Sequence, residues 1–333
     1  MLERREFLSL APTSPAPSEG FWLHLSRPAM ACRFEVTLPL LDRRGVVVAR
    51  RALEEADRLE EQLSIFKASS EISHLNREAA VAPTRTDDSL VSLLLLCREL
   101  HEETGGAFDV TSGPLSKSWG FLRRQGRIPD ASEIATALAL VGGGKIAIDP
   151  ELQTVSFEHD GIEINLGSIG KGYALDRIAA LIRDQVKTAL LSAGSSSMLA
   201  IGNGASGSTG WITGIRHPRH RDRRIAILHL RDTAISTSGN EEQFFEMNGK
   251  RYGHIIDPRS GQPAEGVSGV TVLSDSAAIA DALATAFYVG GPILAAAYCA
   301  NHPQTMVIML ESGSEQPTVF GERLNSEVEI INE

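Results

Sequence analysis

The chain has 333 residues, 42% of them hydrophobic and 22% charged, with a formal net charge of −10. That length provides for one large domain or two lobes around a sizeable core. The acidic balance, without a long basic run, argues against a nucleic-acid surface. Cys32, Cys97 and Cys299 are too few and too far apart for a disulfide framework or a CxxC metal site. No stretch approaches the roughly 18 uninterrupted apolar residues of a membrane span, so we expect no transmembrane segment.

The first twenty residues differ in composition from the rest of the chain. The stretch "RREFLSL" (4–10) is similar to the start of a twin-arginine export signal. Such a signal continues with an apolar segment, whereas "APTSPAPSEG" supplies prolines and serines. We therefore expect residues 1–20 to form a disordered tail. As written, the sequence predicts a soluble, cytoplasmic protein, with the periplasm or cell envelope as the alternative.

Hydrophobic patterning predicts strands at the start of the chain and helices after them. Residues 21–40 alternate as a strand pair does, and apolar residues at helical spacing predict helices over 45–64, 87–106 and 131–144. Strand patterns then dominate, beginning with a hairpin over 145–159. The strand 161–167 and the helix 171–184 follow, and further strands are expected near 188–192, 196–201, 211–215, 224–230, 233–237 and 251–256.

The C-terminal part is predicted to contain the strand 268–274, helices over 279–287 and 292–300, and the strand 305–311. Helices mixed with antiparallel-looking strands, without regular βαβ alternation, favour an α+β fold. We find no internal repeat, and the Gly/Ser-rich residues 202–210 are expected to form an exposed loop.

The helix over residues 279–287 carries two oxygen-bearing side chains on the side opposite its apolar arc. Asp281 and Thr285 stand four residues apart, so they lie one above the other on the helix surface. They could form an ordinary polar outer face. Alternatively, they could provide two oxygen ligands for a hard cation such as magnesium.

A glycine-rich turn in "INLGSIGKGYALD" (164–176) precedes a predicted helix, so that free backbone N–H groups point at the turn. Its glycines allow the close approach of a phosphate, and Lys171 adds a cation. The segment predicts either an anion site or simply a tight turn. It is not a Walker A loop, because Gly172 stands where a magnesium-binding Ser or Thr is required.

Two further segments carry candidate site residues. The loop "GGAFDVTSGPLSKSWGF" (105–121) combines Phe108 and Asp109 with small residues, which suits either a slot for a planar ring or a core loop. The segment "RYGHIIDPRSGQP" (251–263) places His254 and Asp257 at the exit of a strand. A histidine near an aspartate in a turn is a candidate for acid–base or phosphate-orienting work.

Two shorter patterns are weaker. "GNGASG" (202–207) matches GxGxxG but leads into a strand-like segment, so it fails as a dinucleotide fingerprint. "SIGK" (168–171) and "SIFK" (64–67) match SxxK, and "SGN" (238–240) resembles a second motif of the penicillin-binding enzymes. No KTG follows, so a serine acyl-enzyme built on Ser168 and Lys171 is a minor alternative.

Seven blocks in this order resemble the ApbE family, the FAD:protein FMN transferases. The resemblance runs from Met30 to about Gly291 and rests on these segments: "MACRFEV", "LSIFKASSEISHLNR", "TGGAFDVTSGPLSKSWGF", "INLGSIGKGYALD", "STSGN", "YGHIIDPRSGQP" and "ADALATAFYVGG". It implies one catalytic domain over residues 21–325 with the ApbE-like fold, which is related to the T-fold. In that fold mixed antiparallel sheets and flanking helices make two closely packed lobes, with the FAD site between them.

The resemblance also implies the activity. The family transfers FMN from FAD to a threonine or serine hydroxyl of an acceptor flavoprotein, with the help of Mg²⁺, and releases AMP. It usually works outside the cytoplasm. The oligomeric state, monomer or homodimer, stays open.

The resemblance implies a set of site residues. The magnesium ligands are the side chains of Asp281 and Thr285 and the main-chain carbonyl of Ser168. His254, with Asp257 beside it, is expected to orient or deprotonate the acceptor hydroxyl or to help hold the diphosphate. FAD contacts fall on Met30, Phe66, Ala107, Phe108, Asp109, Asn165, Lys171 and Ile255.

The chain departs from the family pattern at three places. Phe66 replaces a tyrosine that stacks on the flavin, and Asn165 replaces an aspartate before the glycine turn. Serines in "AGSSSMLAIG" (193–202) replace a Gly-Gly-Asp segment. These departures concern catalysis more than FAD binding. They leave two alternatives to transfer: an FAD pyrophosphatase that gives FMN and AMP, and a non-catalytic FAD-binding relative.

Overall fold

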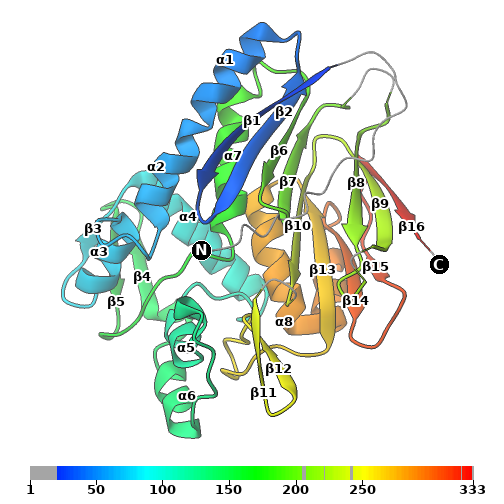
Figure 1. The fold of residues 1–333 in the computed structure, drawn as a ribbon. Helices are drawn as coiled ribbons and strands as arrows, with labels where there is room; N and C mark the ends of the chain where they lie inside the picture. Colours follow the sequence, from blue (N-terminus) through cyan, green and yellow to red (C-terminus); the bar gives the residue numbers. More distant parts are fainter. Residues whose placement is uncertain (1–20, 205–207, 221, 241–242, 324, 332–333) are drawn as a thin grey trace, which may run out of the picture.

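The computed structural model describes residues 21–204, 208–220, 222–240, 243–323 and 325–331. The tail expected at residues 1–20 lies outside the described residues. The fold is α+β, as predicted: helices accompany sheets whose strand pairs are all antiparallel (Figure 1). The proposed division into two lobes with the flavin site between them stays a prediction.

An eight-stranded antiparallel sheet forms the centre of the protein. Along β14, Val307 and Met309 belong to one hydrophobic core, while Ile308 and Leu310 belong to another. This alternation follows from the strand pleat, which sends successive side chains to opposite faces. In spatial order the strands are β1 (Trp22–Ala29), β2 (Cys32–Pro39), β6 (Ala189–Ala193), β7 (Ser197–Ile201), β10 (Ala234–Gly239), β13 (Val267–Ser274), β14 (Met306–Glu311) and β15 (Thr318–Phe320).

Each face of this sheet is covered. The helices α7 (Gly170–Ile182) and α8 (Ala277–Asn301) pack on one face and lie behind the sheet in Figure 1. Leu228 and Leu230 of a small antiparallel sheet pack on the other face. That sheet has the order β16 (Ser326–Ile330), β9 (Arg224–Leu230) and β8 (Trp211–Arg216).

The remaining elements lie around these layers, and α1 and α2 pack against α7 and β1 (Figure 1). Trp119 and Phe121 form a separate small core with Ile256, which joins α5 and α6 to the segment after β12. The elements are α1 (Arg43–Ala52), α2 (Glu54–Leu63), α3 (Glu71–Glu78), β3 (Thr84–Arg85), α4 (Asp88–Glu103), α5 (Gly113–Ser118), η1 (Phe121–Arg123), α6 (Ala131–Leu138), η2 (Gly143–Lys145), β4 (Ile146–Asp149), β5 (Thr154–Phe157), β11 (Phe244–Met247) and β12 (Lys250–Gly253).

Two predicted elements are wrong in part. The single helix over 45–64 is two helices, α1 and α2, which are separated at Leu53. The strand over 161–167 is not a strand. Its backbone instead bonds to isolated partners: the side chain of Asn76 pairs with Ile164, and the N–H of Asn165 donates to the carbonyl of Val110 at 2.7 Å. An apolar alternating pattern cannot distinguish a sheet strand from an extended segment held in this way.

The helix α8 is the one helix among the described residues that is long and apolar enough to span a bilayer. Half of its apolar window is buried within the protein, as expected for a core helix. It is also interrupted: Gly291 has φ 69° and ψ −165°, and Pro292 follows. This kink explains why the sequence predicts two helices, over 279–287 and 292–300.

Candidate active site

The N-terminus of α7 and the first turns of α8 are held together without space between them. A Cβ placed on Gly172 would lie 2.0 Å from the carbonyl oxygen of Ala277, so only glycine permits this approach. Asp176, one turn further along α7, accepts the N–H groups of Ala277 and Ala278 at 2.8 and 2.9 Å. It thereby caps α8, and burial raises the pKa of its carboxyl group. The two helix starts are thus fixed relative to each other.

Asp281 points into this junction. Asp281 is only 5% exposed, so the alternative that it belongs to a polar outer face of the helix is wrong. One carboxylate oxygen accepts the N–H of Gly172 at 3.1 Å, and the other accepts the hydroxyls of Ser236 at 2.9 Å and Ser197 at 3.4 Å. All three donors are neutral, and no Lys, Arg or His among the described residues forms an ion pair with this carboxylate. Among the described residues, Asp281 is therefore a buried carboxylate that has hydrogen-bond donors but no ion-pair partner.

Thr285 lies one turn further along α8, and it is half-buried. Its hydroxyl oxygen is 3.4 Å from the carbonyl oxygen of Asp281 and 3.3 Å from the Ser238 hydroxyl. Ser168 is half-buried in the turn before α7, where the N–H of Gly170 donates to Leu166 O at 2.8 Å. Two of the predicted metal ligands thus belong to α8, and the third belongs to the turn that leads into α7, the helix that the Gly172–Asp281 hydrogen bond joins to α8. Their role as ligands stays a prediction.

The glycine turn is tied to its neighbours on both sides. On one side Asn165 accepts the N–H of Gly167 at 3.0 Å through its side chain, an Asx turn, and its own N–H reaches the 105–121 loop at Val110. On the other side Lys171 donates from Nζ to the Ser196 hydroxyl at 2.7 Å. The turn therefore contacts both the loop over residues 105–121, called the aromatic loop below, and the serine segment (residues 195–197) between β6 and β7.

The aromatic loop is more deeply buried than a ring-binding slot requires. The side chains of Ala107 and Phe108 lie in the main hydrophobic core, each 1% exposed, which favours the core-loop alternative for the Phe108 ring. Contacts of these two residues with a ligand would have to come from the backbone. The N–H of Phe108 already donates to Thr104 Oγ1 at 3.2 Å, and its carbonyl lies 3.1 Å from His101 Nδ1.

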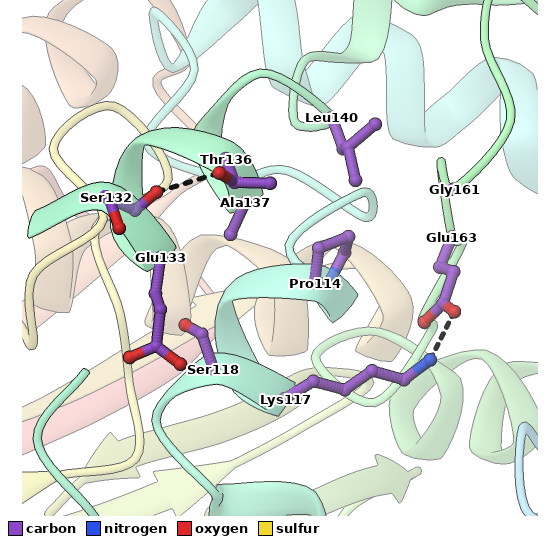
Figure 2. A pocket seen from close by; sticks show the side chains of 10 residues that line it. All are labelled: Pro114, Lys117, Ser118, Ser132, Glu133, Thr136, Ala137, Leu140, Gly161 and Glu163. Carbon is purple, nitrogen blue, oxygen red and sulfur yellow. Dashed lines mark hydrogen bonds and ion pairs between the residues drawn. The ribbon is translucent and has the colours of Figure 1, made fainter. Parts of the chain in front are cut away.

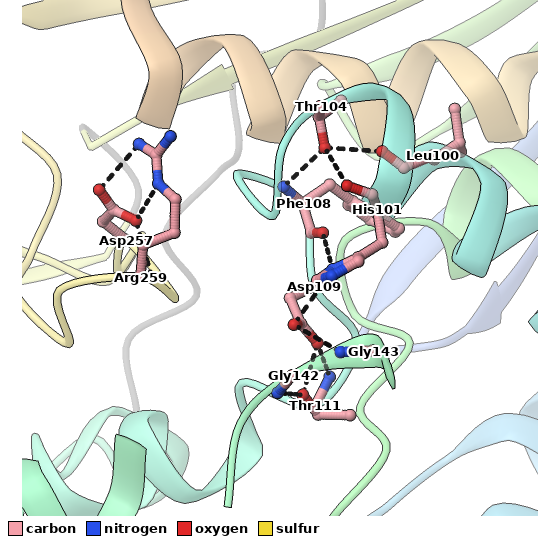
Figure 3. Close-up of polar contacts among 10 residues, drawn as sticks. All are labelled: Leu100, His101, Thr104, Phe108, Asp109, Thr111, Gly142, Gly143, Asp257 and Arg259. Carbon is pink, nitrogen blue, oxygen red and sulfur yellow. Dashed lines mark hydrogen bonds and ion pairs between the residues drawn. The ribbon is translucent and has the colours of Figure 1, made fainter. Parts of the chain in front are cut away.

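The carboxylate of Asp109 is buried, and its hydrogen-bond partners are all groups of the protein itself (Figure 3). One oxygen accepts the N–H and hydroxyl of Thr111 at 2.7 and 2.5 Å. The other accepts the N–H of Gly143 at 3.1 Å and lies 3.2 Å from His101 Nδ1. The hydrogen bond to Asp109 raises the pKa of His101, although burial opposes it. In this structure the carboxylate organises the loop.

Met30 lies in the turn between β1 and β2, and Phe66 lies in the segment after α2. Met30 and Ala31 have φ values of 49° and 58°, a left-handed conformation that costs energy for residues other than glycine. Glu60 on α2 connects the two predicted residues: it accepts the N–H of Met30 at 3.0 Å and lies 3.5 Å from Lys67 Nζ, next to Phe66. The Phe66 ring is 75% exposed, so it is available for stacking.

His254 lies just beyond β12 and beside the end of β10. A Cβ on the preceding Gly253 would lie 2.1 Å from Cγ of Asn240, so the two strand ends are in direct contact. His254 Nδ1 lies 3.0 Å from Gln243 O, which fixes the ring orientation. Because Ser238 on β10 contacts Thr285, the end of β10 connects the histidine to the helix α8.

Asp257 and Ile255 follow His254 in the chain. Asp257 is engaged by Arg259, whose Nε and Nη2 donate to its two carboxylate oxygens at 2.9 Å each (Figure 3). This pairing raises the pKa of Arg259. Ile255 is 8% exposed and belongs to the main core. Arg259 also lies 3.7 Å from the Cβ position of Gly106, which brings this turn to the aromatic loop.

A surface pocket of about 410 Å³ lies between α5 and α6 (Figure 2). None of the predicted site residues lines it, so we do not assign it to the flavin. Its lining residues are Pro114, Lys117, Ser118, Ser132, Glu133, Thr136, Ala137, Leu140, Gly161 and Glu163.

A histidine cluster lies in the loops after β8 and β14. His217, His220 and Glu315 bring possible ligand atoms within 4.8 Å of one another. However, His217 Nδ1 accepts the N–H groups of Arg219 and His220 at 3.0 and 3.2 Å, so its Nε2 carries the ring proton. Glu315 also pairs with Arg219 at 3.1 Å. A protonated Nε2 and a neighbouring arginine disfavour a metal ion here.

Sequence reasoning missed the hydroxyl groups around Asp281. Ser197, Ser236 and Ser238 come from two strands that are adjacent in space but far apart in the chain. In the sequence, Ser236 and Ser238 stood within the family block "STSGN" and its weak SGN match, and Ser197 stood within the segment that departs from the family pattern. Ser197 and Ser236 directly adjoin apolar residues of predicted strands, "MLAI" and "AI", and this is the signal that could have indicated hydroxyls at the core.

Comparisons with known proteins agree on one family. The family model described as "ApbE family" matches residues 30–309. An FAD:protein FMN transferase of Vibrio cholerae is 30% identical over 305 residues, covering 88% of this chain and 90% of its own length. One of Treponema pallidum is 31% identical over 278 residues, covering 78% and 76%. The crystal structure of the ApbE protein of Thermotoga maritima superposes with a TM-score of 0.80 at 29% identity, covering 91% of this chain and 97% of that one.

Proposed function

Because the chain belongs to the ApbE family, we propose that it is a magnesium-dependent transferase that moves FMN from FAD to a Thr or Ser hydroxyl of an acceptor flavoprotein and releases AMP. Its relatives carry the name FAD:protein FMN transferase, and a structural neighbour at 27% identity is a flavin transferase of Vibrio cholerae. Transfer of FMN to protein is the family's activity. The metal, the target hydroxyl and the leaving group are the parts that we propose for this chain.

The buried, uncompensated carboxylate of Asp281 is the observation that carries the magnesium proposal. A buried charge without a partner costs several kcal/mol, roughly, unless a counter-ion is supplied. The neighbouring oxygens are of the kind that Mg²⁺ prefers: carboxylate, hydroxyl and main-chain carbonyl. Asp281, Thr285 and Ser168 would hold the ion, which when bound neutralises charge on the diphosphate and on the departing AMP.

The residues around this position would hold the diphosphate of FAD. The N-terminus of α7 presents the positive end of the helix dipole. Lys171, in the first turn of α7, adds an ammonium group that its present partner, a serine hydroxyl, leaves positively charged. The exposed Phe66 ring would stack on the flavin. Asn165 holds the glycine turn to the aromatic loop, where backbone groups of residues 107–109 and the neighbouring Ile255 would contact FAD.

His254 is the group that we propose for the acceptor hydroxyl. Its Nδ1 lies 3.0 Å from Gln243 O, and the imidazole would take the hydroxyl proton as the oxygen attacks the FMN phosphorus and AMP departs. Asp257 is paired with Arg259 in a bidentate contact. This contact supports a role for Asp257 in holding the turn that carries His254, rather than in moving a proton.

One assay separates transfer from its alternatives. The full chain is incubated with FAD, Mg²⁺ and an acceptor flavoprotein, and AMP and protein-bound flavin fluorescence are followed together. Transfer predicts AMP and a labelled acceptor in equal amounts. AMP without labelling would instead identify an FAD pyrophosphatase, and tight FAD binding without either product would identify a non-catalytic relative.

A further inference from the structure

Lys171 and Asp281 lie at the same end of α7 but do not pair with each other. Lys171 Nζ donates to Ser196 Oγ at 2.7 Å. Ser196 Oγ is 3.4 Å from Ser197 Oγ, which is in turn 3.4 Å from Asp281 Oδ1. Two hydroxyl groups therefore separate the ammonium from the carboxylate.

This separation is unexpected from electrostatics alone. A lysine side chain has a flexible four-carbon stem, and a buried carboxylate nearby attracts it strongly. The N-terminus of a helix also disfavours a cation that has no anionic partner. Direct pairing of Lys171 with Asp281 would cancel both charges and leave no site for a divalent cation.

Ser196 is rigidly placed to prevent that pairing. Its carbonyl accepts the N–H of Thr237 on β10 at 2.8 Å, which fixes its backbone against the large sheet. Ser196 is half-buried in the turn between β6 and β7, immediately before the first residue of β7. A hydroxyl is neutral, so it binds the ammonium without cancelling its charge. An aspartate here would form an ion pair and compete with phosphate for Lys171.

We propose that Ser196 is a positioning residue that keeps the ammonium of Lys171 off Asp281. The carboxylate is thereby left for the divalent cation, and the ammonium is left for the diphosphate of FAD. The inference rests on the proposed function, because it assumes the cation site at Asp281. Ser196 itself need not touch the substrate.

The test measures the binding of Mn²⁺, as a spectroscopic substitute for Mg²⁺, to the full chain by electron paramagnetic resonance. In Ser196→Ala, Lys171 is released toward Asp281, and Mn²⁺ should bind about tenfold more weakly, the size of one charge-assisted contact. Ser196→Thr keeps the hydroxyl and should restore wild-type affinity. Ser118→Ala is the matched control, since that hydroxyl donates only to Leu115 O in its own helix.

The decisive comparison uses a second background. In Lys171→Gln the competing ammonium is absent, so adding Ser196→Ala should leave Mn²⁺ affinity unchanged. A merely structural role for Ser196 would weaken binding equally in both backgrounds, which would overturn the proposal. Wild-type affinity in Ser196→Ala alone would also overturn it. If Asp281→Asn binds Mn²⁺ as the wild type does, the assignment of the cation to Asp281 is wrong, and the magnesium part of the proposed function fails independently of the role of Ser196.

Discussion

Replacing Asp281 with asparagine removes the buried charge and keeps the side-chain shape. The amide oxygen can still accept from Ser236 and Ser197, whereas the amide nitrogen faces the N–H of Gly172. That donor–donor contact costs about 1–3 kcal/mol. It is offset by removing a carboxylate that has no counter-ion, which is a cost of similar size or larger. Without a divalent cation, the unfolding temperature of Asp281→Asn should therefore stay close to that of the wild type.

Magnesium should raise the unfolding temperature of the wild type but not that of Asp281→Asn. An ion at about 100 times its dissociation constant stabilises the native state by about 2.7 kcal/mol. The unfolding entropy of a chain of 333 residues is about 0.7 kcal/mol/K, so each kcal/mol raises the unfolding temperature by about 1.4 °C. Wild-type protein should therefore gain roughly 4 °C in saturating Mg²⁺ over EDTA. Asp281→Asn should gain nothing.

The assay is thermal unfolding followed by circular dichroism, in MgCl₂ and in EDTA with NaCl at matched ionic strength. Asp184→Asn is the matched control, because that carboxylate is exposed near the far end of α7 and should leave the magnesium response intact. An undiminished magnesium-dependent rise in Asp281→Asn would refute the assignment of the ion to this carboxylate.

Three further predictions concern packing, titration and reactivity. Gly172→Ala should destabilise the protein by about 1–3 kcal/mol in chemical unfolding, because its Cβ would collide with the backbone of α8. Gly170→Ala is the control and should be neutral, because a Cβ there meets nothing within 4 Å. Equal losses of stability in the two variants would contradict this reasoning. The hydrogen bond to Asp109 raises the pKa of His101 above about 6.5. The stabilisation from this pair is therefore complete below that pH and is lost as the pH rises through the raised pKa. NMR titration should show the raised pKa of His101, and Asp109→Asn should lower that pKa; an unchanged pKa in the variant would refute the pairing. Burial raises the pKa of Cys97, so a thiol reagent at pH 8 should modify it only after unfolding, and labelling of the folded chain would contradict its burial.

The sequence predicted the elements that local patterns define. The strand pair over 21–40 and the helix around Asp281 follow from periodicity, and the turn at Gly167–Gly172 follows from glycine spacing. Their meeting point did not follow from periodicity, because Gly172 and Asp281 are joined only by tertiary packing. The family resemblance supplied that juxtaposition.

The missed features share a physical cause. The extended segment before the glycine turn has the apolar alternation of a strand but takes its hydrogen bonds from Asn76 and Val110. Of the two alternatives for Phe108, a slot for a planar ring or a core loop, its buried ring favours the core loop. The Ser196–Lys171 contact depends on a strand turn meeting a helix 25 residues away in the chain. Such partners depend on tertiary contacts, which single-sequence patterns do not encode.

The most direct test of the cation site is a crystal structure of the protein soaked with Mn²⁺, with anomalous scattering used to locate the ion. We expect one strong anomalous peak about 2 Å from a carboxylate oxygen of Asp281, with the Thr285 hydroxyl and the Ser168 carbonyl as further ligands. A peak at other residues, or none at Asp281 when the ion is in excess, would contradict the account.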